Sequence, residues 1–212
     1  MTDSSGQRVE WWDQSVFKEW IIIERLAGVI LHYVKGCIVE IGLGHSTPVL
    51  AKYAKKFNIR HYAVDIDAGR CRKAEKNPVV KHDGFIVYNG RSLDFIETFD
   101  DTPALVFIDG CHDAEIVIQE AMFFIDKIPP GGVIFLHDTF LAEEWEQRIA
   151  ELDWFSDTYR ARWELENLKD IWCFTFPYTA RALGLTMIMK RPEYEYDSGH
   201  IGESYRGRPF VA

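Results

Sequence analysis

The stretch Gly36–Thr47, GCIVEIGLGHST, predicts a buried β-strand that leads through a tight glycine turn into a helix. Cys37–Ile41 is a short apolar run interrupted only by Glu40, as expected for a buried strand. Gly42 and Gly44 allow the backbone to turn sharply and allow a ligand to approach without meeting a side chain. We therefore expect a strand, a turn open to a ligand, and a helix, in that order.

The residues after the turn favour a helix and then a second strand. Ser46 or Thr47 is placed to cap the helix, and Pro48 suits its first turn. The second strand, His61–Val64, ends in Asp65, about twenty residues after the turn. This combination suits a nucleoside, because the turn offers backbone N–H groups and the carboxylate accepts both ribose hydroxyls. The alternative is an ordinary β-turn-α unit with a solvated Asp65.

The chemistry of the turn indicates which nucleoside. A dinucleotide-binding turn carries a third glycine near the pyrophosphate, and Thr47 stands at that position here. Glu40, two residues ahead of the first glycine, would repel a pyrophosphate but would suit a ligand with positive charge. S-adenosylmethionine has a sulfonium, an amino group and a ribose but no phosphate, and it is the cofactor that we expect.

Strand-like and helix-like segments alternate along the rest of the chain. Right-handed crossovers then place helices on both faces of a parallel sheet, and the last two strands are too close for a crossover helix, so they form an antiparallel hairpin. The predicted fold is a single α/β domain with a doubly wound, mostly parallel seven-stranded Rossmann-like sheet. The expected strands are 37–41, 61–64, 84–88, 104–108, 133–136, 171–176 and 184–190; the expected helices are 49–57, 70–76, 92–98, 114–127 and 141–152. In 114–127 the charged residues are expected opposite the apolar face.

Composition narrows the class of protein. The 212 residues, 47% of them hydrophobic, suffice for one domain with a full core. The net charge of −9 argues against non-specific nucleic-acid binding, which needs a positive field. No apolar run reaches membrane-spanning length and no leader is expected at the start. The four cysteines are scattered without a C-x-x-C pair, so we expect a reducing cytoplasm.

The order of motifs resembles the class I S-adenosylmethionine-dependent methyltransferases. Residues 39–47 are similar to the first motif of that superfamily and residues 62–65 to its second. More narrowly, 107–112 followed by 131–138 resembles a group of small-molecule O-methyltransferases that act on sugar hydroxyls of antibiotics. The resemblance covers roughly residues 35–190. It implies O-methylation of a small-molecule hydroxyl, with a helical cap segment at 1–34, the methyltransferase domain at 35–191 and a polar tail at 192–212.

Polar side chains at the ends of neighbouring strands are the candidates for catalysis. Asp109 follows the fourth strand, and His137 and Asp138 follow the fifth. Because ligands bind at the carboxyl edge of an open α/β sheet, these three side chains could converge on one divalent ion. An aliphatic hydroxyl needs a general base, a metal ion or both. His112, three residues past Asp109, is the expected base, and Asp109 and His112 are the predicted catalytic residues.

Which metal ion we expect depends on a position where this sequence departs from the family pattern. By resemblance, the antibiotic-type enzymes bind magnesium through a carboxylate that matches Asp109 and an acidic pair that matches positions 137 and 138. This chain has His137 in that pair, and one carboxylate fewer favours manganese, iron or zinc, or no metal. Magnesium or manganese on Asp109, His137 and Asp138 is the prediction. The alternatives are a rim position for His112, a structural hydrogen-bonding role for His137 and a helix cap for Asp138.

The predicted cofactor-binding residues include a second departure. The family often has an acid after the turn glycine that contacts the adenine amino group, and this chain has Asn89-Gly-Arg-Ser92. Adenine is then expected to be held by Ser92 and backbone, with Arg91 stacked or pointing away. The full set is Glu40, Gly42, Gly44, His45, Ser46, Thr47, Asp65, Arg91, Ser92 and Asp109.

Two other functions stay open from the sequence. One is methylation of nucleic acid or protein, which the acidic charge disfavours. Base-amine methylation also usually carries an Asn/Asp-Pro-Pro-aromatic motif after the fourth strand, where this chain has IDGCH. The other is a protein that binds S-adenosylmethionine without methylating. No nucleic-acid or membrane partner is expected, and a tail that docks on a second copy would make a homodimer.

Overall fold

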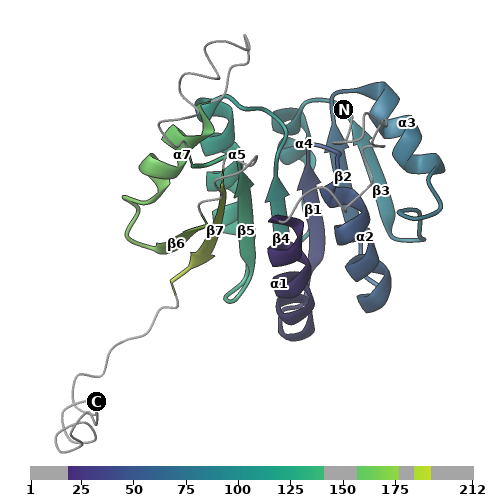
Figure 1. Cartoon of the computed structure of the whole chain (residues 1–212), viewed down its shortest axis with the longest axis horizontal. Helices are drawn as coiled ribbons and strands as arrows, with labels where there is room; N and C mark the ends of the chain where they lie inside the picture. The colour runs from purple at the N-terminus through teal and green to yellow at the C-terminus, as the bar shows by residue number, and fades with distance from the viewer. Residues whose placement is uncertain (1–18, 141–156, 177–183, 192–212) are drawn as a thin grey trace, which may run out of the picture.

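The structure, a computed structural model, describes residues 19–140, 157–176 and 184–191. In these residues one seven-stranded sheet has the order β3-β2-β1-β4-β5-β7-β6 (Figure 1). Strands β1 to β5 are mutually parallel, and β7 pairs antiparallel with both β5 and β6. The predicted sheet and its terminal hairpin are therefore confirmed. The strands are β1 Cys37–Ile41, β2 His61–Asp65, β3 Phe85–Asn89, β4 Pro103–Ile108, β5 Val133–His137, β6 Ile171–Phe176 and β7 Leu185–Lys190.

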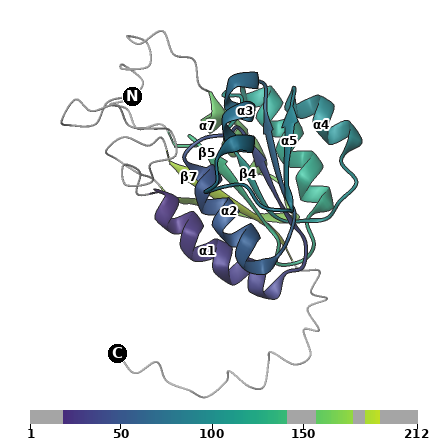
Figure 2. The same ribbon diagram turned by 90° about the vertical axis from the view of Figure 1, so that its right-hand side faces the viewer.

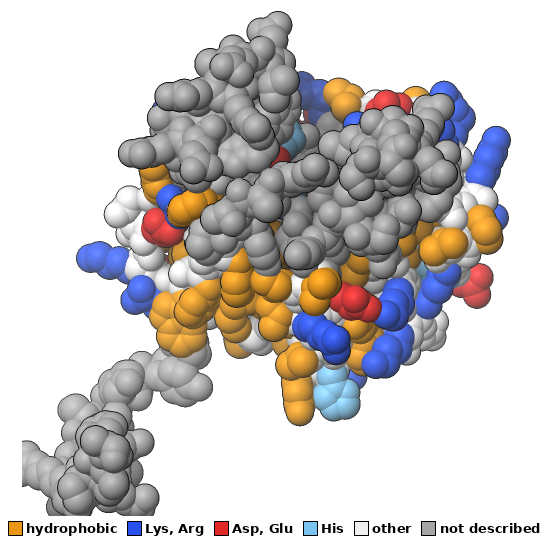
Figure 3. Space-filling view, viewed as in Figure 1, with side chains coloured by type: hydrophobic (Ala, Val, Ile, Leu, Met, Phe, Trp, Pro, Cys, Tyr) orange, Lys and Arg blue, Asp and Glu red, His pale blue; other side chains and the backbone are white. Residues whose placement is uncertain are grey.

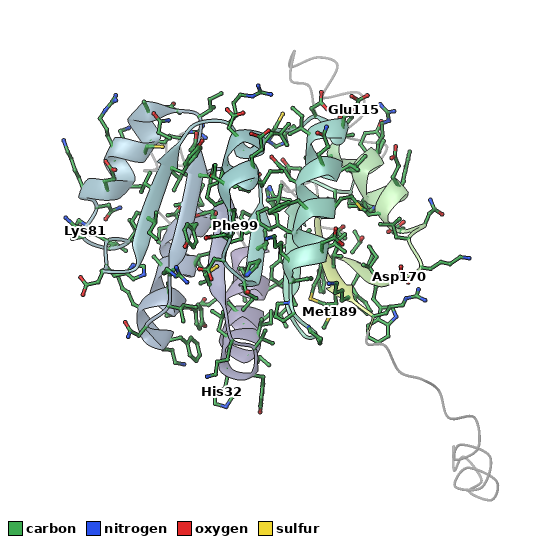
Figure 4. The ribbon with its side chains drawn as sticks, turned by 180° about the vertical axis from the view of Figure 1, so that it is seen from behind. His32, Lys81, Phe99, Glu115, Asp170 and Met189 are labelled. Carbon is green, nitrogen blue, oxygen red and sulfur yellow. The ribbon has the colours of Figure 1, made fainter. Side chains whose placement is uncertain are left out.

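Helices cover both faces of the sheet. Helices α1 and α2 lie on one side and α4 and α5 on the other (Figure 2). Side chains alternate across β1, so that Ile38 packs with α1 and α2 while Val39 packs with α4, α5 and α7. Phe99, labelled in Figure 4, is buried in the second of these layers. The helices are α1 Glu19–Tyr33, α2 Ser46–Phe57, α3 Ala68–Lys76, α4 Ser92–Thr98, α5 Ala114–Lys127 and α7 Thr158–Leu165.

Burial follows the position of each strand in the sheet. β1 and β4 are buried at every residue, which is why their sequences are apolar apart from Glu40. β6 lies at the edge, and its Trp172 and Phe174 are exposed. The alternate residues Ile171 and Cys173 pack in the α5 layer, so Trp172 and Phe174 face the α1 side of the sheet. Apolar side chains are visible on that face in Figure 3.

The N-terminal helix, one further helix and two undescribed segments bear on the sequence expectations. The described part of the predicted cap segment 1–34 is α1, which packs against α2 and β4 and contributes buried Ile23 and Ala27 to the core. Helix α7 was not predicted. The predicted helix 141–152 lies outside the described residues, as does the tail from 192. No described helix has the length and apolarity that a membrane crossing requires.

The strand order creates a switch point between β1 and β4. From β1 the chain proceeds outward to β2 and β3, and it then returns to β4 and β5 on the other side of β1. Such a point leaves a crevice at the carboxyl ends of the two central strands. Gly42, just after β1, has φ +91°. A side chain there would place Cβ 2.1 Å from the carbonyl oxygen of Asp109, so the closeness of the two strand ends requires glycine.

We predict that Gly42→Ala destabilises the protein by at least about 2 kcal/mol, because it combines backbone strain with a backbone clash. Gly44→Ala is the matched control, since a Cβ at Gly44 would meet no atom within 4 Å. The midpoint of urea unfolding should fall for the first variant and change little for the second. Equal midpoints for the two variants would contradict the packing described at Gly42.

Candidate active site

A cavity of about 370 Å³ lies at the carboxyl edge of the sheet, within the size range of small-molecule pockets. The ends of β1, β2 and β4 and the starts of α3, α4 and α5 form its wall. Glycine backbone, apolar side chains and a few charged groups meet there. The lining residues are Ile41, Gly42, Val64, Asp65, Ile66, Asp67, Arg70, Gly90, Arg91, Ser92, Leu93, Gly110, Cys111 and Ile116.

Asp65 connects the glycine turn to the cavity. Its carboxylate accepts the backbone N–H of Leu43 at 2.9 Å and the backbone N–H of Asp67 at 2.7 Å. The guanidinium of Arg70 lies 3.5 Å from the same carboxylate. Asp65 is nearly buried but lines the cavity. Charge-assisted bonds of this kind hold the carboxylate in one orientation, so the turn and the predicted ribose acceptor are held as one unit.

Glu40 lies beneath the turn and does not line the cavity. Its carboxylate accepts the hydroxyls of Ser46 and Thr47 and lies 3.2 Å from Nε2 of His61. All four side chains are completely buried. The structure thus gives Glu40 hydrogen-bond partners of the protein itself, where the sequence suggested a positively charged ligand.

The helix after the turn begins differently from the sequence expectation. His45 is the N-cap residue of α2, and its side chain makes no capping hydrogen bond. The hydroxyls of Ser46 and Thr47 are donated to Glu40, so the prediction that either residue is the N-cap was wrong. Thr47 Oγ1 also accepts the N–H of Gly44 at 3.0 Å. These bonds connect the turn to the start of α2 and to Glu40 of β1.

The structure divides the predicted cofactor residues into two groups. Four of them line the cavity: Gly42, Asp65, Arg91 and Ser92. The other six lie outside the lining: Glu40, Gly44, His45, Ser46, Thr47 and Asp109. Sequence reasoning missed the apolar wall of Ile66, Leu93 and Ile116. Ile66 follows β2 directly and is 73% exposed, and an apolar residue immediately after the strand-end acid was the available signal.

A buried acid lies behind this wall. Glu120 on α5 is completely buried, although the charged residues of this helix were expected on its solvent side. Burial raises the pKa of its carboxyl to about 7, and the nearby hydroxyl of Ser92 opposes that rise. The spacing from Val117 and Phe124 places position 120 on the buried face of the helix.

A cluster of acids and histidines adjoins the cavity at the ends of β4 and β5. Nδ1 of His137 lies 3.0 Å from Asp109 Oδ1 and 3.2 Å from Asp138 Oδ1. Nδ1 of His112 lies 3.4 Å from Asp138 Oδ2. The convergence predicted for Asp109, His137 and Asp138 is therefore present, and His112 lies beside it. Asp109 and His112 flank Gly110 and Cys111 of the cavity wall, so the cluster and the cavity share one loop.

Asp138 has a backbone conformation that is unusual outside glycine. Its φ is +56°, in the left-handed region. Strained backbone of this kind is concentrated at functional sites, where the surrounding structure maintains it. Here it accompanies a carboxylate that reaches two histidines at once.

Asp109, His137 and Asp138 are also able to hold a metal ion. Each offers one ligand atom, and these atoms all lie within 4.8 Å of one another. One imidazole nitrogen with two carboxylate oxygens suits manganese, iron or zinc better than magnesium. The donor set therefore fits a divalent ion, although a proton on His137 Nδ1 would equally satisfy the two carboxylates.

Comparisons with known proteins identify the domain that carries this site. Residues 39–139 match the model of a family described as a methyltransferase domain. These residues form a methyltransferase domain. The matched range contains the whole cavity lining, Glu120 and the acid–histidine cluster, and it confirms the methyltransferase predicted from the sequence.

Solved structures share the methyltransferase fold at low sequence identity. Cofactor-bound Rv0187 from MTB has a TM-score of 0.65 at 22% identity, with 82% of this chain and 80% of that chain covered. An O-methyltransferase from Bacillus cereus in complex with SAH has a TM-score of 0.64 at 16% identity, with 84% of each chain covered. TomG from Streptomyces achromogenes, an O-methyltransferase in complex with SAM, has a TM-score of 0.61 at 18% identity, with 84% of this chain and 82% of that chain covered. No curated protein matches the sequence.

Proposed function

We propose that this methyltransferase takes its methyl group from S-adenosylmethionine and delivers it to a hydroxyl group of a small molecule. The observation that carries the proposal is the shared loop between the Asp65 cavity and the acid–histidine cluster. A nucleoside site and a proton-accepting site thereby adjoin. The solved structures named as O-methyltransferases, with SAM in TomG and SAH in the Bacillus cereus enzyme, support the same assignment.

The cavity suits the adenosyl part of this cofactor. The carboxylate of Asp65 would accept the ribose hydroxyls, and Ile66, Leu93 and Ile116 offer apolar walls for a purine ring. Arg91 and Ser92 border the same end of the cavity. When bound, the cofactor supplies an activated methyl group, so the protein must mainly position the two reactants and remove a proton. Roles in binding for Gly44, His45, Ser46, Thr47 and Asp109 stay predictions.

His112 is the general base in this mechanism. Asp138 lies beside its Nδ1, and a carboxylate in that position orients the imidazole and stabilises its protonated form. The opposite nitrogen, Nε2, would then take the proton of the acceptor hydroxyl. Asp109 lies three residues before His112 and holds His137 at the base of the same loop.

A divalent ion would be held by Asp109, His137 and Asp138. Its chemistry there would be to lower the pKa of the acceptor hydroxyl and to orient that hydroxyl for transfer. The ion would then act on the oxygen of the acceptor hydroxyl, and His112 would take its proton. We propose manganese or magnesium, with manganese preferred by the imidazole ligand.

The further expectations about partners remain part of this proposal. We expect no nucleic-acid partner, a homodimer as the assembly and a cytoplasmic location. The domain boundaries 35–191 and the tail 192–212 are likewise proposed. Release of S-adenosylhomocysteine with a panel of hydroxylated small molecules, RNA and protein would separate this function from nucleic-acid or protein methylation. No turnover with any acceptor, despite cofactor binding, would favour the non-catalytic alternative.

We predict that Asp65→Ala weakens S-adenosylhomocysteine binding by about 1–3 kcal/mol through the loss of charge-assisted hydrogen bonds. Calorimetry would measure the binding, and thermal unfolding would detect any loss of the bond to the turn. Asp67→Asn is the matched control, because Asn keeps the cap of α3 that Asp67 provides. Binding of NAD in place of S-adenosylhomocysteine would show that the proposed cofactor is wrong.

We predict that His112→Ala lowers the rate by about 10²–10⁴, the usual contribution of positioned proton transfer. Cofactor affinity should hardly change, because His112 serves the acceptor. The control is His32→Ala, an exposed histidine on α1 (Figure 4). Turnover close to that of the wild type would show that His112 lies at the edge of the site and is not the general base. His137 would then be the next candidate for the base.

We predict that a chelator lowers activity and that manganese restores it at least as well as magnesium, because the ligand set contains an imidazole. Calorimetry with manganese alone should detect one site in the wild type and none in His137→Ala. Full activity in chelator would remove the metal from the mechanism and leave His112 as the sole base.

A further inference from the structure

Glu120 lies directly behind the wall of the cavity. Ile116, four residues earlier on α5, lines the cavity, and residues four apart share one face of a helix. Ser92, at the start of α4, also lines the cavity. Glu120 is the polar side chain behind both, and it is completely buried.

The carboxyl of Glu120 lacks the partners that a buried acid normally has. Neither oxygen makes a hydrogen bond of normal geometry, yet the hydroxyl of Ser92 lies close enough to lower the carboxyl's pKa. Burial has the larger effect and raises that pKa to about 7. No charged side chain of the described elements around α5 contributes. The charged or titratable side chains on these elements include Asp94 and Glu97 on α4, Glu115 on α5, Arg160 and Arg162 on α7, Asp109 after β4 and His137 on β5.

We propose that Glu120 is a positioning residue that sets the direction of the Ser92 hydroxyl and thereby selects a 6-amino purine over a 6-oxo purine in the cavity. The inference rests on the proposed cofactor. Ser92 is the hydroxyl among the lining residues, and a hydroxyl can either donate or accept toward a ligand. Which of the two it does depends on the group behind it.

The ionised and protonated forms of Glu120 orient the hydroxyl in opposite ways. An ionised carboxylate only accepts, so Ser92 donates its hydrogen to Glu120 and presents lone pairs to the cavity. Those lone pairs accept the exocyclic amino group of adenine. A protonated carboxyl donates its own hydrogen to the Ser92 oxygen, and the Ser92 hydrogen then points into the cavity. That donor suits a carbonyl oxygen and not an amino group.

Proton binding and ligand binding are therefore coupled. An adenosyl ligand binds better to the ionised form, so its affinity rises as the pH increases through about 7 and each binding event releases a fraction of a proton. In the ligand-free protein, a rise in pH has the opposite effect on the free energy of unfolding, which decreases. The pKa of Glu120 is higher in the folded state than its ordinary value of 4.5, so the folded state binds this proton more tightly, and stability falls as the pH rises through that range.

The test compares S-adenosylhomocysteine with its deaminated analogue, S-inosylhomocysteine, by calorimetry at about pH 5.5 and about pH 8, on either side of the raised pKa. In the wild type, the ratio of affinities for the amino compound over the deaminated compound should be about five- to tenfold larger at the higher pH. A factor of this size corresponds to the free energy of one hydrogen bond. Glu120→Gln should keep the preference at both pH values, because its amide oxygen accepts from Ser92 regardless of pH. Glu120→Leu should lose the preference at both.

Two controls separate this role from a structural one. Glu115→Gln changes an exposed glutamate on the same helix (Figure 4) and should behave as the wild type. Thermal unfolding of the ligand-free protein should lose stability from about pH 5 to 8 in the wild type but not in Glu120→Gln, because the glutamine has no proton to bind. An unchanged pH dependence of the preference in Glu120→Gln would overturn the inference while leaving the cofactor intact. Failure of the wild type to bind S-adenosylhomocysteine at either pH would overturn both.

Discussion

The ends of β1 and β4 lie so close together that one residue between them has no room for a side chain. Gly42 faces the carbonyl of Asp109 at this point, and parallel pairing of the two strands brings the loops after them to the same edge. The glycine turn after β1 and Asp109 after β4 are consequently held at a distance that this backbone contact determines. Both halves of the site depend on that contact, because the cavity wall and the acid–histidine cluster begin on either side of it.

Two carboxylates near the turn perform different tasks. Glu40 is enclosed beneath it and takes its hydrogen bonds from Ser46, Thr47 and His61, whereas Asp65 reaches the cavity while it accepts backbone N–H groups from both sides. The first arrangement makes the turn rigid from below, and the second keeps an acceptor oriented before any ligand arrives. Preorganisation of this kind reduces the ordering that binding would otherwise require.

The sequence was sufficient for the sheet and insufficient for the direction of several side chains. Short apolar runs predicted β1, β4 and β5. The polar residues at the strand ends predicted the convergence of Asp109, His137 and Asp138, because parallel strands bring their carboxyl ends together. The roles of Glu40 and Glu120 could not be predicted in this way. Both are acids whose burial depends on hydroxyls or apolar side chains from other elements, and local pattern assigns an acid to a ligand or to solvent. The wall at Ile66 was missed because a single apolar residue after a strand carries no periodicity.

The left-handed backbone at Asp138 limits what evolution can do at that position. Only glycine, asparagine and aspartate enter this conformation readily, so these are the residues that would leave the loop undisturbed. Asparagine differs from aspartate by one nucleotide and would remove the acid next to His112 without disturbing the sheet. A single nucleotide change could therefore remove one carboxylate from the acid–histidine cluster and leave the backbone of the domain as it is.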